Sequence, residues 1–250
     1  MTGFTSTSLR NYTVEQVVET AIKSKSEIIE WGSDKHILTL ADAEKAGNLC
    51  RENGIDVKSF GTYYRIGSGE TEQWKDLCEK AKLLGSSVLR TWLGFKGSAF
   101  TSERDYDQLV NDAVSVCDIA SEYGLTVSNE CHPNTYNDTT VSSLKFISDV
   151  NRNNLKTYYQ SWYREDASDK EKLYKTIVHV TDVHLSFSEL IKFQAFRKKD
   201  RDYIVKIISW LNDLDFNGNI LIEFTKHNTP EDMITDMEKL RKVISDVRGK

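Results

Sequence analysis

Hydrophobic and polar positions follow a repeating unit along the chain. Each unit has an amphipathic helical pattern, a glycine, and a short β-branched run that ends in polar residues. The unit is clearest in ENG-IDVKSF, LLG-SSVLRTW, EYG-LTVSNE and FNG-NILIEF, which contain Gly54, Gly85, Gly124 and Gly218. A glycine directly after a helix supplies the left-handed conformation that ends it. Strands and helices that alternate over such short connections predict parallel strands joined in βαβ units.

Eight such strands and eight helices fill the 250 residues. The strands are expected near residues 2–7, 27–31, 55–60, 87–92, 125–131, 155–160, 177–185 and 219–224. The helices are expected near residues 13–25, 42–53, 70–84, 103–123, 139–150, 168–176, 200–215 and 230–247. Two helix starts are marked by a capping box at Thr13 and Gln16 and by Thr229 before Pro230. We therefore predict an α/β fold with a single (β/α)₈ barrel domain spanning residues 1–250.

An open doubly wound sheet is the alternative fold. Such a sheet usually carries a G-x-G-x-x-G phosphate loop after its first strand. The segment GFTSTSLR at that place has no such loop. The barrel is therefore the preferred interpretation.

Composition narrows the function classes. The net charge of −5 contains no concentrated Lys/Arg block, which argues against a nucleic-acid partner. No apolar run reaches the ~20 residues of a membrane helix, and the N-terminus lacks a signal-peptide pattern. The cysteines form no C-x-x-C pair, and Cys50, Cys78 and Cys117 lie in helical apolar patterns. We expect small buried thiols, no membrane partner and a reducing, cytoplasmic location.

Most of the predicted strands begin apolar and end on polar or aromatic residues. In a parallel barrel the carboxyl ends of all strands open on one face, where active sites lie. Side chains alternate along a strand, so Glu223 should point inward while Ile222 and Phe224 point outward. The same rule pairs Glu130 with His132, Arg90 with Trp92, Tyr158 with Gln160, and Asp182 with His184.

Each of these residues also has an ordinary structural interpretation. A carboxylate at a strand end is usually solvated or ion-paired, and a tryptophan usually packs in the core. Their joint occurrence favours a functional interpretation, because burying unpaired carboxylates inside a barrel mouth costs folding free energy. A cation or a polar ligand is the natural partner for them. We therefore expect Glu130, Gln160, His184 and Glu223 to converge on a small-molecule site.

Seven segments match a known family. They are IEWGSDKH (29–36), SFGTYYR (59–65), LRTWLG (89–94), NECHPNT (129–135), TYYQSWY (157–163), VTDVHLSF (180–187) and LIEF (221–224). Through them the chain resembles the xylose isomerase-like barrels. This superfamily contains sugar and sugar-phosphate isomerases and epimerases, and also the DNA-repair enzymes of the endonuclease IV (AP endonuclease 2) type.

The resemblance implies a metal site. Metal-dependent members hold a divalent cation with Glu, Asp, His and Glu on strands five to eight. Glu130, His184 and Glu223 match three of these positions, and Gln160 replaces the aspartate. A glutamine carbonyl can ligate a hard cation without supplying charge. A manganese, cobalt, magnesium or zinc ion is therefore expected on the condition that Gln160 is a ligand.

The resemblance also implies a mechanism of metal-assisted proton transfer, with Glu130 and Glu223 as base and acid on a sugar or sugar phosphate. Further residues are expected to contact the sugar or polyol substrate. They are Trp31, His36, Tyr63, Arg65, Arg90, Trp92, His132, Tyr158 and Trp162. The sequence leaves the sugar, its phosphorylation and a homo-oligomeric state open.

Three other interpretations remain. A barrel that binds a sugar or polyol without catalysis would account for Gln160, and a dehydratase would share the first proton abstraction. The endonuclease-type phosphodiesterase would require three zinc ions and more histidines than the five present. Tyr163 also stands where that family places a histidine.

Overall fold

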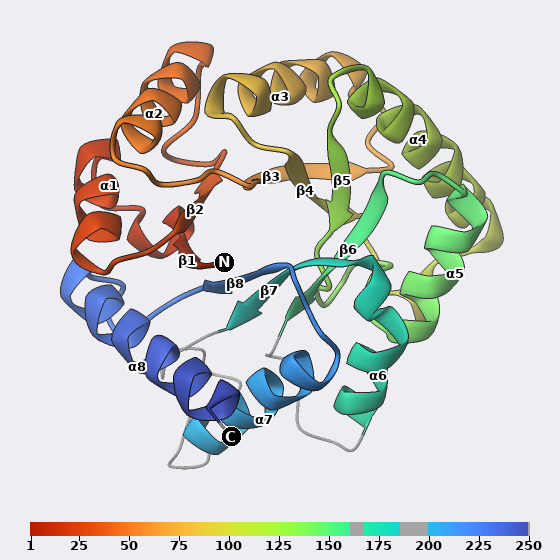
Figure 1. Ribbon diagram of the computed structural model, residues 1–250. Helices are drawn as coiled ribbons and strands as arrows, with labels where there is room; N and C mark the ends of the chain where they lie inside the picture. Colours follow the sequence, from red (N-terminus) through yellow and green to blue (C-terminus); the bar gives the residue numbers. More distant parts are fainter. Residues whose placement is uncertain (161–167, 186–199, 250) are drawn as a thin grey trace.

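The chain forms a closed barrel of parallel strands surrounded by helices (Figure 1). A computed structural model describes residues 1–160, 168–185 and 200–249. The strands are β1 (Thr2–Thr5), β2 (Ile28–Gly32), β3 (Ser59–Ile66), β4 (Val88–Leu93), β5 (Thr126–Asn129), β6 (Leu155–Gln160), β7 (Val180–Leu185) and β8 (Asn219–Ile222). Each strand pairs in parallel with the next, and β8 closes the barrel on β1. The predicted fold class is confirmed.

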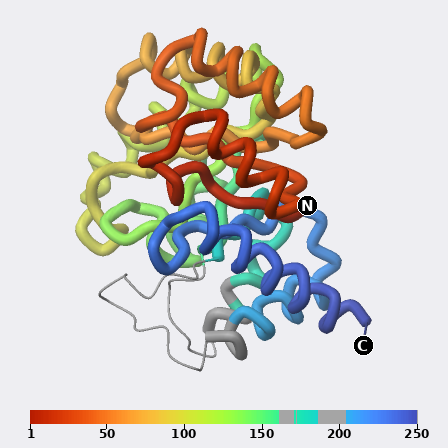
Figure 2. Tube along the Cα trace, turned by 90° about the vertical axis from the view of Figure 1, so that its left-hand side faces the viewer, coloured from red at the N-terminus to blue at the C-terminus, as the bar shows by residue number. Residues whose placement is uncertain are grey.

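The helices alternate with the strands as predicted. They are α1 (Val14–Lys23), α2 (Leu40–Glu52), α3 (Thr71–Leu84), α4 (Glu103–Glu122), α5 (Thr140–Val150), α6 (Ser168–Thr176), α7 (Asp200–Asp213) and α8 (Pro230–Arg248). Both predicted start signals are present. Thr13 and Gln16 form the reciprocal capping box, and the Thr229 side chain accepts from the backbone N–H of Asp232. In Figure 2 the two termini lie on the same side of the barrel.

The glycine rule holds at three of the four repeats. Gly54, Gly85 and Gly124 have positive φ, as expected after a helix. At the fourth repeat the prediction was wrong, because Asp215 takes the left-handed conformation instead. Gly218 is required by space, since a Cβ there would lie 2.3 Å from the carbonyl oxygen of Thr181.

Strand β3 differs most from its prediction. The sequence indicated residues 55–60, whereas the strand runs from Ser59 to Ile66. The strand continues through Gly61, which leaves room for side chains inside the barrel. A Cβ at Gly61 would lie 2.9 Å from Glu30 Oε1. Tyr63 and Arg65 therefore lie on the strand itself.

The hydrophobic core lies between the sheet and the helices. Trp31, Phe60 and Trp74 are among its largest fully buried side chains, and Trp74 Nε1 donates to the Val116 carbonyl at 2.9 Å. Cys50, Cys78 and Cys117 are buried free thiols, as predicted, and burial raises the pKa of Cys50 to about 11. Within the described residues, no helix combines the length and apolar character needed to cross a bilayer. Alternation places polar residues on the inner face of the barrel where the strands end.

Candidate active site at the barrel mouth

Inward-facing charged side chains gather where the strands end, which we call the mouth of the barrel. Five of them form a group that we call the floor. The floor consists of Glu30, Arg90, Glu130, His184 and Glu223, all at most 3 % exposed. Glu130 and Glu223 follow β5 and β8 directly, and their backbone N–H groups still bond to Thr91 and Leu185 on the neighbouring strands. The predicted strand alternation is therefore what brings these side chains inside.

Three floor residues could hold a metal ion. One ligand atom each from Glu130, His184 and Glu223 lies within 4.8 Å of the others. His184 Nδ1 is 3.3 Å from Glu223 Oε2 and 3.8 Å from Glu130 Oε1. The convergence of these three predicted ligands provides a candidate metal site.

The donor set fits a divalent cation. His184 Nδ1 and Glu223 Oε2 are buried without a hydrogen-bond partner, and burial without a partner is costly for such atoms. Two carboxylates and an imidazole are ligands that zinc, manganese and magnesium accept in proteins. The residues therefore match the group that the sequence predicted.

Gln160 lies beside this group. Its Nε2 donates to Glu130 Oε1, and its Oε1 is buried without a partner. Rotation of the side-chain amide by 180° would exchange its two ends and bring Oε1 to the position next to Glu130. A role for Gln160 as fourth ligand stays a prediction.

Arg90 supplies a second source of positive charge. Its Nη1 lies 3.1 Å from Glu130 Oε2, 3.8 Å from Glu223 Oε1 and 3.9 Å from Glu30 Oε1. Its Nε and Nη2 are buried without hydrogen-bond partners. The guanidinium therefore contacts three carboxylates and still has donors available for a bound molecule.

The floor shifts the pKa values of its own groups. Burial raises the pKa of Glu130, although Arg90 opposes the effect. Burial lowers the pKa of His184, but the Glu223 and Glu30 carboxylates outweigh it and leave the pKa well above its usual value. Perturbed groups of this kind, gathered in one cluster, are typical of catalytic sites.

Glu30 was missed by the sequence analysis. It lies on β2, its Oε2 accepts from Tyr158 Oη at 2.8 Å, and it is 3.6 Å from His184 Nε2. Burial raises its pKa, but His184 and Arg90 outweigh this effect and lower the pKa to about 2. The available signal was a single charge within the apolar run IIEW, which places one carboxylate on the face opposite Trp31.

Asp182 also faces the barrel interior, below the floor. Its Oδ1 accepts from Asn219 Nδ2 at 2.8 Å. Burial, with Glu30 nearby, raises its pKa to about 6. The predicted pairing of Asp182 with His184 on one face of β7 agrees with the burial of both.

Half-buried aromatic and basic residues form a second layer, which we call the rim. The rim consists of Tyr63, Arg65, Trp92 and His132. His132 stacks on Trp92 with ring centroids 4.8 Å apart, and the Arg65 guanidinium lies 4.4 Å from the centre of the Trp92 ring. Trp92 Nε1 donates to Glu130 Oε2, so the rim is joined to the floor.

The remaining predicted substrate residues lie elsewhere. The ring centroids of Trp31 and His36 lie 5.6 Å apart, and Trp31 belongs to the hydrophobic core. His36 Nε2 is 3.1 Å from the Tyr12 carbonyl oxygen. Tyr158 is buried on the inner face with its hydroxyl bonded to Glu30. Trp162, like Tyr163, lies outside the described residues.

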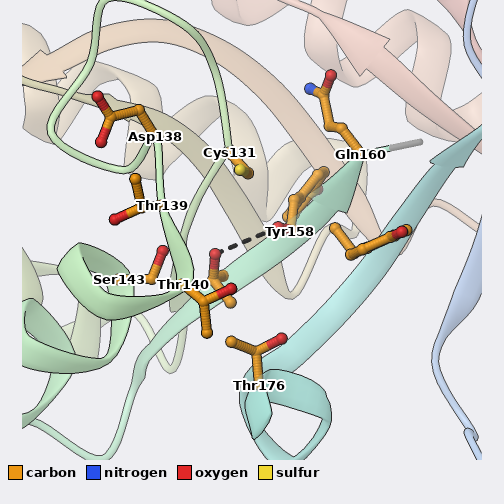
Figure 3. A pocket seen from close by; sticks show the side chains of 10 residues that line it. Cys131, Asp138, Thr139, Thr140, Ser143, Tyr158, Gln160 and Thr176 are labelled. Atoms are coloured by element: carbon orange, nitrogen blue, oxygen red, sulfur yellow. Dashed lines mark hydrogen bonds between the residues drawn. The ribbon is translucent and has the colours of Figure 1, made fainter. Parts of the chain in front are cut away.

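A narrow cavity of about 40 Å³ lies beside β6 (Figure 3). Its lining includes Asp138, Thr139 and Ser143 near the start of α5, together with Cys131. In Figure 3 the Gln160 side chain lies at the end of β6, apart from Asp138, Thr139 and Ser143. Of the four predicted metal ligands, Gln160 alone lines this cavity. The cavity is therefore distinct from the floor.

Comparisons with known proteins agree with this architecture. A family model described as "Xylose isomerase-like TIM barrel" matches residues 19–243. A 3-dehydroshikimate dehydratase from Bacillus anthracis is 28% identical over 149 residues, which cover 56% of this chain and 53% of that relative. The match thus spans about half the length of the curated relative.

Two solved structures illustrate the range of similar barrels. A probable 3-DHS dehydratase from Bacillus anthracis superposes with a TM-score of 0.81 at 19% identity, covering 96% of this chain and 98% of that chain. A D-psicose 3-epimerase from Clostridium cellulolyticum H10, solved with D-tagatose, gives a TM-score of 0.71 at 14% identity, covering 99% and 98%. At these identities, the likeness concerns the fold.

Proposed function

The chain belongs to the xylose isomerase-like TIM barrel family, and from this premise we propose that it removes a proton from the carbon next to the carbonyl of a small, sugar-like substrate. The reaction would be completed as an isomerisation or epimerisation. The observation that carries the proposal is the meeting of Glu130, His184 and Glu223 in one buried group. A sugar or a sugar phosphate is the proposed substrate class.

Glu130 and Glu223 are the proposed acid and base. They come from different strands, and Arg90 Nη1 lies within 4 Å of a carboxylate oxygen of each. An acid or base works best when its pKa is moved toward the working pH, and burial raises the pKa of Glu130. The shared guanidinium would stabilise whichever of the two carboxylates is ionised as a proton is taken up by one and released by the other.

Glu130, His184 and Glu223, with Gln160 as a conditional fourth ligand, are proposed to hold a divalent cation. When bound, such an ion polarises a carbonyl and lowers the cost of the enediolate that forms after proton removal. The protein would contribute the placement of the donors and the exclusion of water, since all four residues are buried. Manganese, cobalt, magnesium and zinc remain candidates.

The rim is proposed to hold the substrate. Tyr63, Trp92 and His132 offer aromatic surfaces, and Arg65 offers a cation fixed by stacking and by a 2.6 Å bond to the Gly94 carbonyl. Aromatic walls with a few directed polar groups are typical of small-ligand pockets. Arg90 and Tyr158 would act from within the barrel. Trp31, His36 and Trp162 stay predictions without a described contact to the floor.

A dehydratase is the second candidate. It is favoured by the sequence match to the Bacillus anthracis dehydratase. Elimination begins with the same proton removal, but a hydroxyl group then leaves with a proton supplied by an acid. His132, on the rim two residues after Glu130, is a proposed donor for that step. A sugar- or polyol-binding barrel without chemistry would show neither reaction.

The three-zinc phosphodiesterase is the least supported alternative. Among the described residues, His184 is the one histidine in the group that could hold a metal ion. His227 pairs with Asp232 on the surface, and His36 lies against the Tyr12 carbonyl. We therefore propose no nucleic-acid substrate.

The experiment is a screen of ketoses, aldoses and cyclic hydroxy-ketones in deuterated water with added manganese. Deuterium at carbon with an unchanged formula would identify isomerisation or epimerisation, and loss of water would identify dehydration. Glu130→Gln should abolish both signals, while Glu122→Gln on the exposed end of α4 should leave them intact. Exchange that persists in Glu130→Gln would contradict the assignment.

A further inference from the structure

Glu30 has no part in the proposed proton transfer or metal ligation, yet it is completely buried. A buried carboxylate must be compensated by hydrogen bonds or cations. Its Oε2 receives one hydrogen bond, from Tyr158 Oη at 2.8 Å, and its Oε1 receives none. The nearest cationic groups are His184 and Arg90, at 3.6 and 3.9 Å. These contacts indicate a role directed at one of those two residues.

The position of Glu30 relative to the His184 ring is specific. Glu30 Oε2 faces Nε2 at 3.6 Å, whereas Glu223 Oε2 faces Nδ1 at 3.3 Å. The two imidazole nitrogens are chemically distinct, and the group facing one nitrogen determines the state of the other. When a cation occupies the space between Nδ1, Glu130 and Glu223, the ring proton is left on Nε2, where the Glu30 carboxylate faces it.

The surrounding residues preserve this arrangement. Tyr158 donates to Glu30, and its ring also lies edge-on to the His184 ring, with centroids 4.9 Å apart and an 88° angle between the planes. On the other side, a Cβ on Gly61 would lie 2.9 Å from Glu30 Oε1 and 3.1 Å from Arg90 Nη2. Strands β2, β3 and β6 thus combine to hold one carboxylate beside one ring nitrogen.

We propose that Glu30 is a positioning residue for His184. It holds the ring with Nε2 toward β2 and Nδ1 toward Glu130 and Glu223, and so increases the affinity of the site for a divalent cation. A carboxylate that accepts from the second nitrogen of a metal-bound histidine fixes the ring and strengthens it as a donor. This inference rests on the proposed function, because it requires the metal site.

The test is the manganese affinity of the purified, metal-free protein at pH 7.5, measured by calorimetric titration. Glu30→Gln should weaken binding by about 10- to 100-fold, the range found for such supporting carboxylates. Tyr158→Phe keeps the carboxylate but removes its donor, and should weaken binding less. Thermal unfolding of each variant would show that it is folded.

Two further variants separate positioning from charge. Asp182→Asn removes another fully buried carboxylate of the inner face, whose oxygen is bonded to Asn219. Glu27→Gln changes a carboxylate just before β2, the strand that carries Glu30; the Glu27 carboxylate accepts from the Thr2 backbone N–H. We expect a change of at most about threefold in either. Equal losses in Glu30→Gln and Asp182→Asn would overturn positioning in favour of a general effect of charge.

A nitrogen-15 spectrum of the zinc-loaded protein gives a readout independent of affinity. The wild type should show His184 bound through Nδ1 and protonated at Nε2, and Glu30→Gln should lose that single state. Unchanged affinity and an unchanged spectrum in Glu30→Gln would refute the inference while leaving the proposed function standing. A wild type that binds no metal would overturn the metal site itself, and Glu30's role with it.

Discussion

The floor and the rim of the mouth differ in how their charges are compensated. Floor residues are almost fully buried, and each charged group faces an opposite charge within 4 Å. Rim residues are half-buried, and Arg65 is held by two aromatic rings and a carbonyl oxygen. The floor is therefore suited to changes of charge during a reaction. The rim is suited to contacts with a molecule that enters and leaves.

This contrast predicts the largest effect for Glu223→Gln. Loss of a positioned acid or base costs roughly 10²- to 10⁴-fold in turnover. Glu223 also contacts both His184 and Arg90, so its loss leaves both with one partner fewer. Steady-state kinetics on the identified substrate would show a fall in kcat. A variant with more than half of wild-type kcat would break the distinction between floor and rim, and Glu238→Gln on the exposed face of α8 is the control.

Metal loading should stabilise the floor measurably. A ligand present at 100 times its Kd adds about 2.7 kcal/mol to the free energy of unfolding. For a chain of this length, that corresponds to a rise in Tm of roughly 5–10 °C. Differential scanning calorimetry with and without manganese, after removal of metal by a chelator, would measure it. An equal rise in Glu223→Gln would mean that the ion binds elsewhere.

Arg65→Ala should act on binding alone. A hydrogen bond to a charged group contributes about 1.5–3 kcal/mol, so KM should rise at least roughly tenfold if the substrate contacts this guanidinium. Arg65 contacts no floor residue directly, and kcat should stay within about twofold. Arg152→Ala, which removes an exposed partner of Asp118, is the matched control. A fall in kcat with constant KM would place Arg65 in the chemistry instead.

Trp31→Phe should have the smallest effect on activity. Trp31 is buried in the core and contacts His36, so the substitution should lower the free energy of unfolding by about 1–3 kcal/mol. Urea unfolding and substrate kinetics on the same samples would separate the two effects. A change in KM would support the sequence-based expectation that Trp31 contacts the substrate.

The sequence predicted the fold because its signals are local. Capping at Thr13 and Thr229 and the glycines at 54, 85 and 124 mark helix ends by backbone chemistry alone. Alternation then indicates which residues face inward, and it correctly brought Glu130, His184 and Glu223 together.

Contacts between distant strands could not be read in this way. The partnership of Glu30 with Tyr158 spans 128 positions, and the space that Gly61 leaves inside the barrel adjoins side chains of two other strands, Glu30 and Arg90. Trp31 was expected to contact the substrate, and Glu30 was not considered, although alternation places the two on opposite faces of β2. A single charged residue within an otherwise apolar barrel strand is therefore best predicted to face the barrel interior.

The central claim is that Glu130, His184 and Glu223 jointly bind a divalent cation. The most direct measurement is the anomalous scattering of crystals grown with manganese. The account predicts one strong peak within coordination distance of all three side chains. A mouth with no anomalous peak at saturating manganese, or a peak that contacts none of the three, would contradict it.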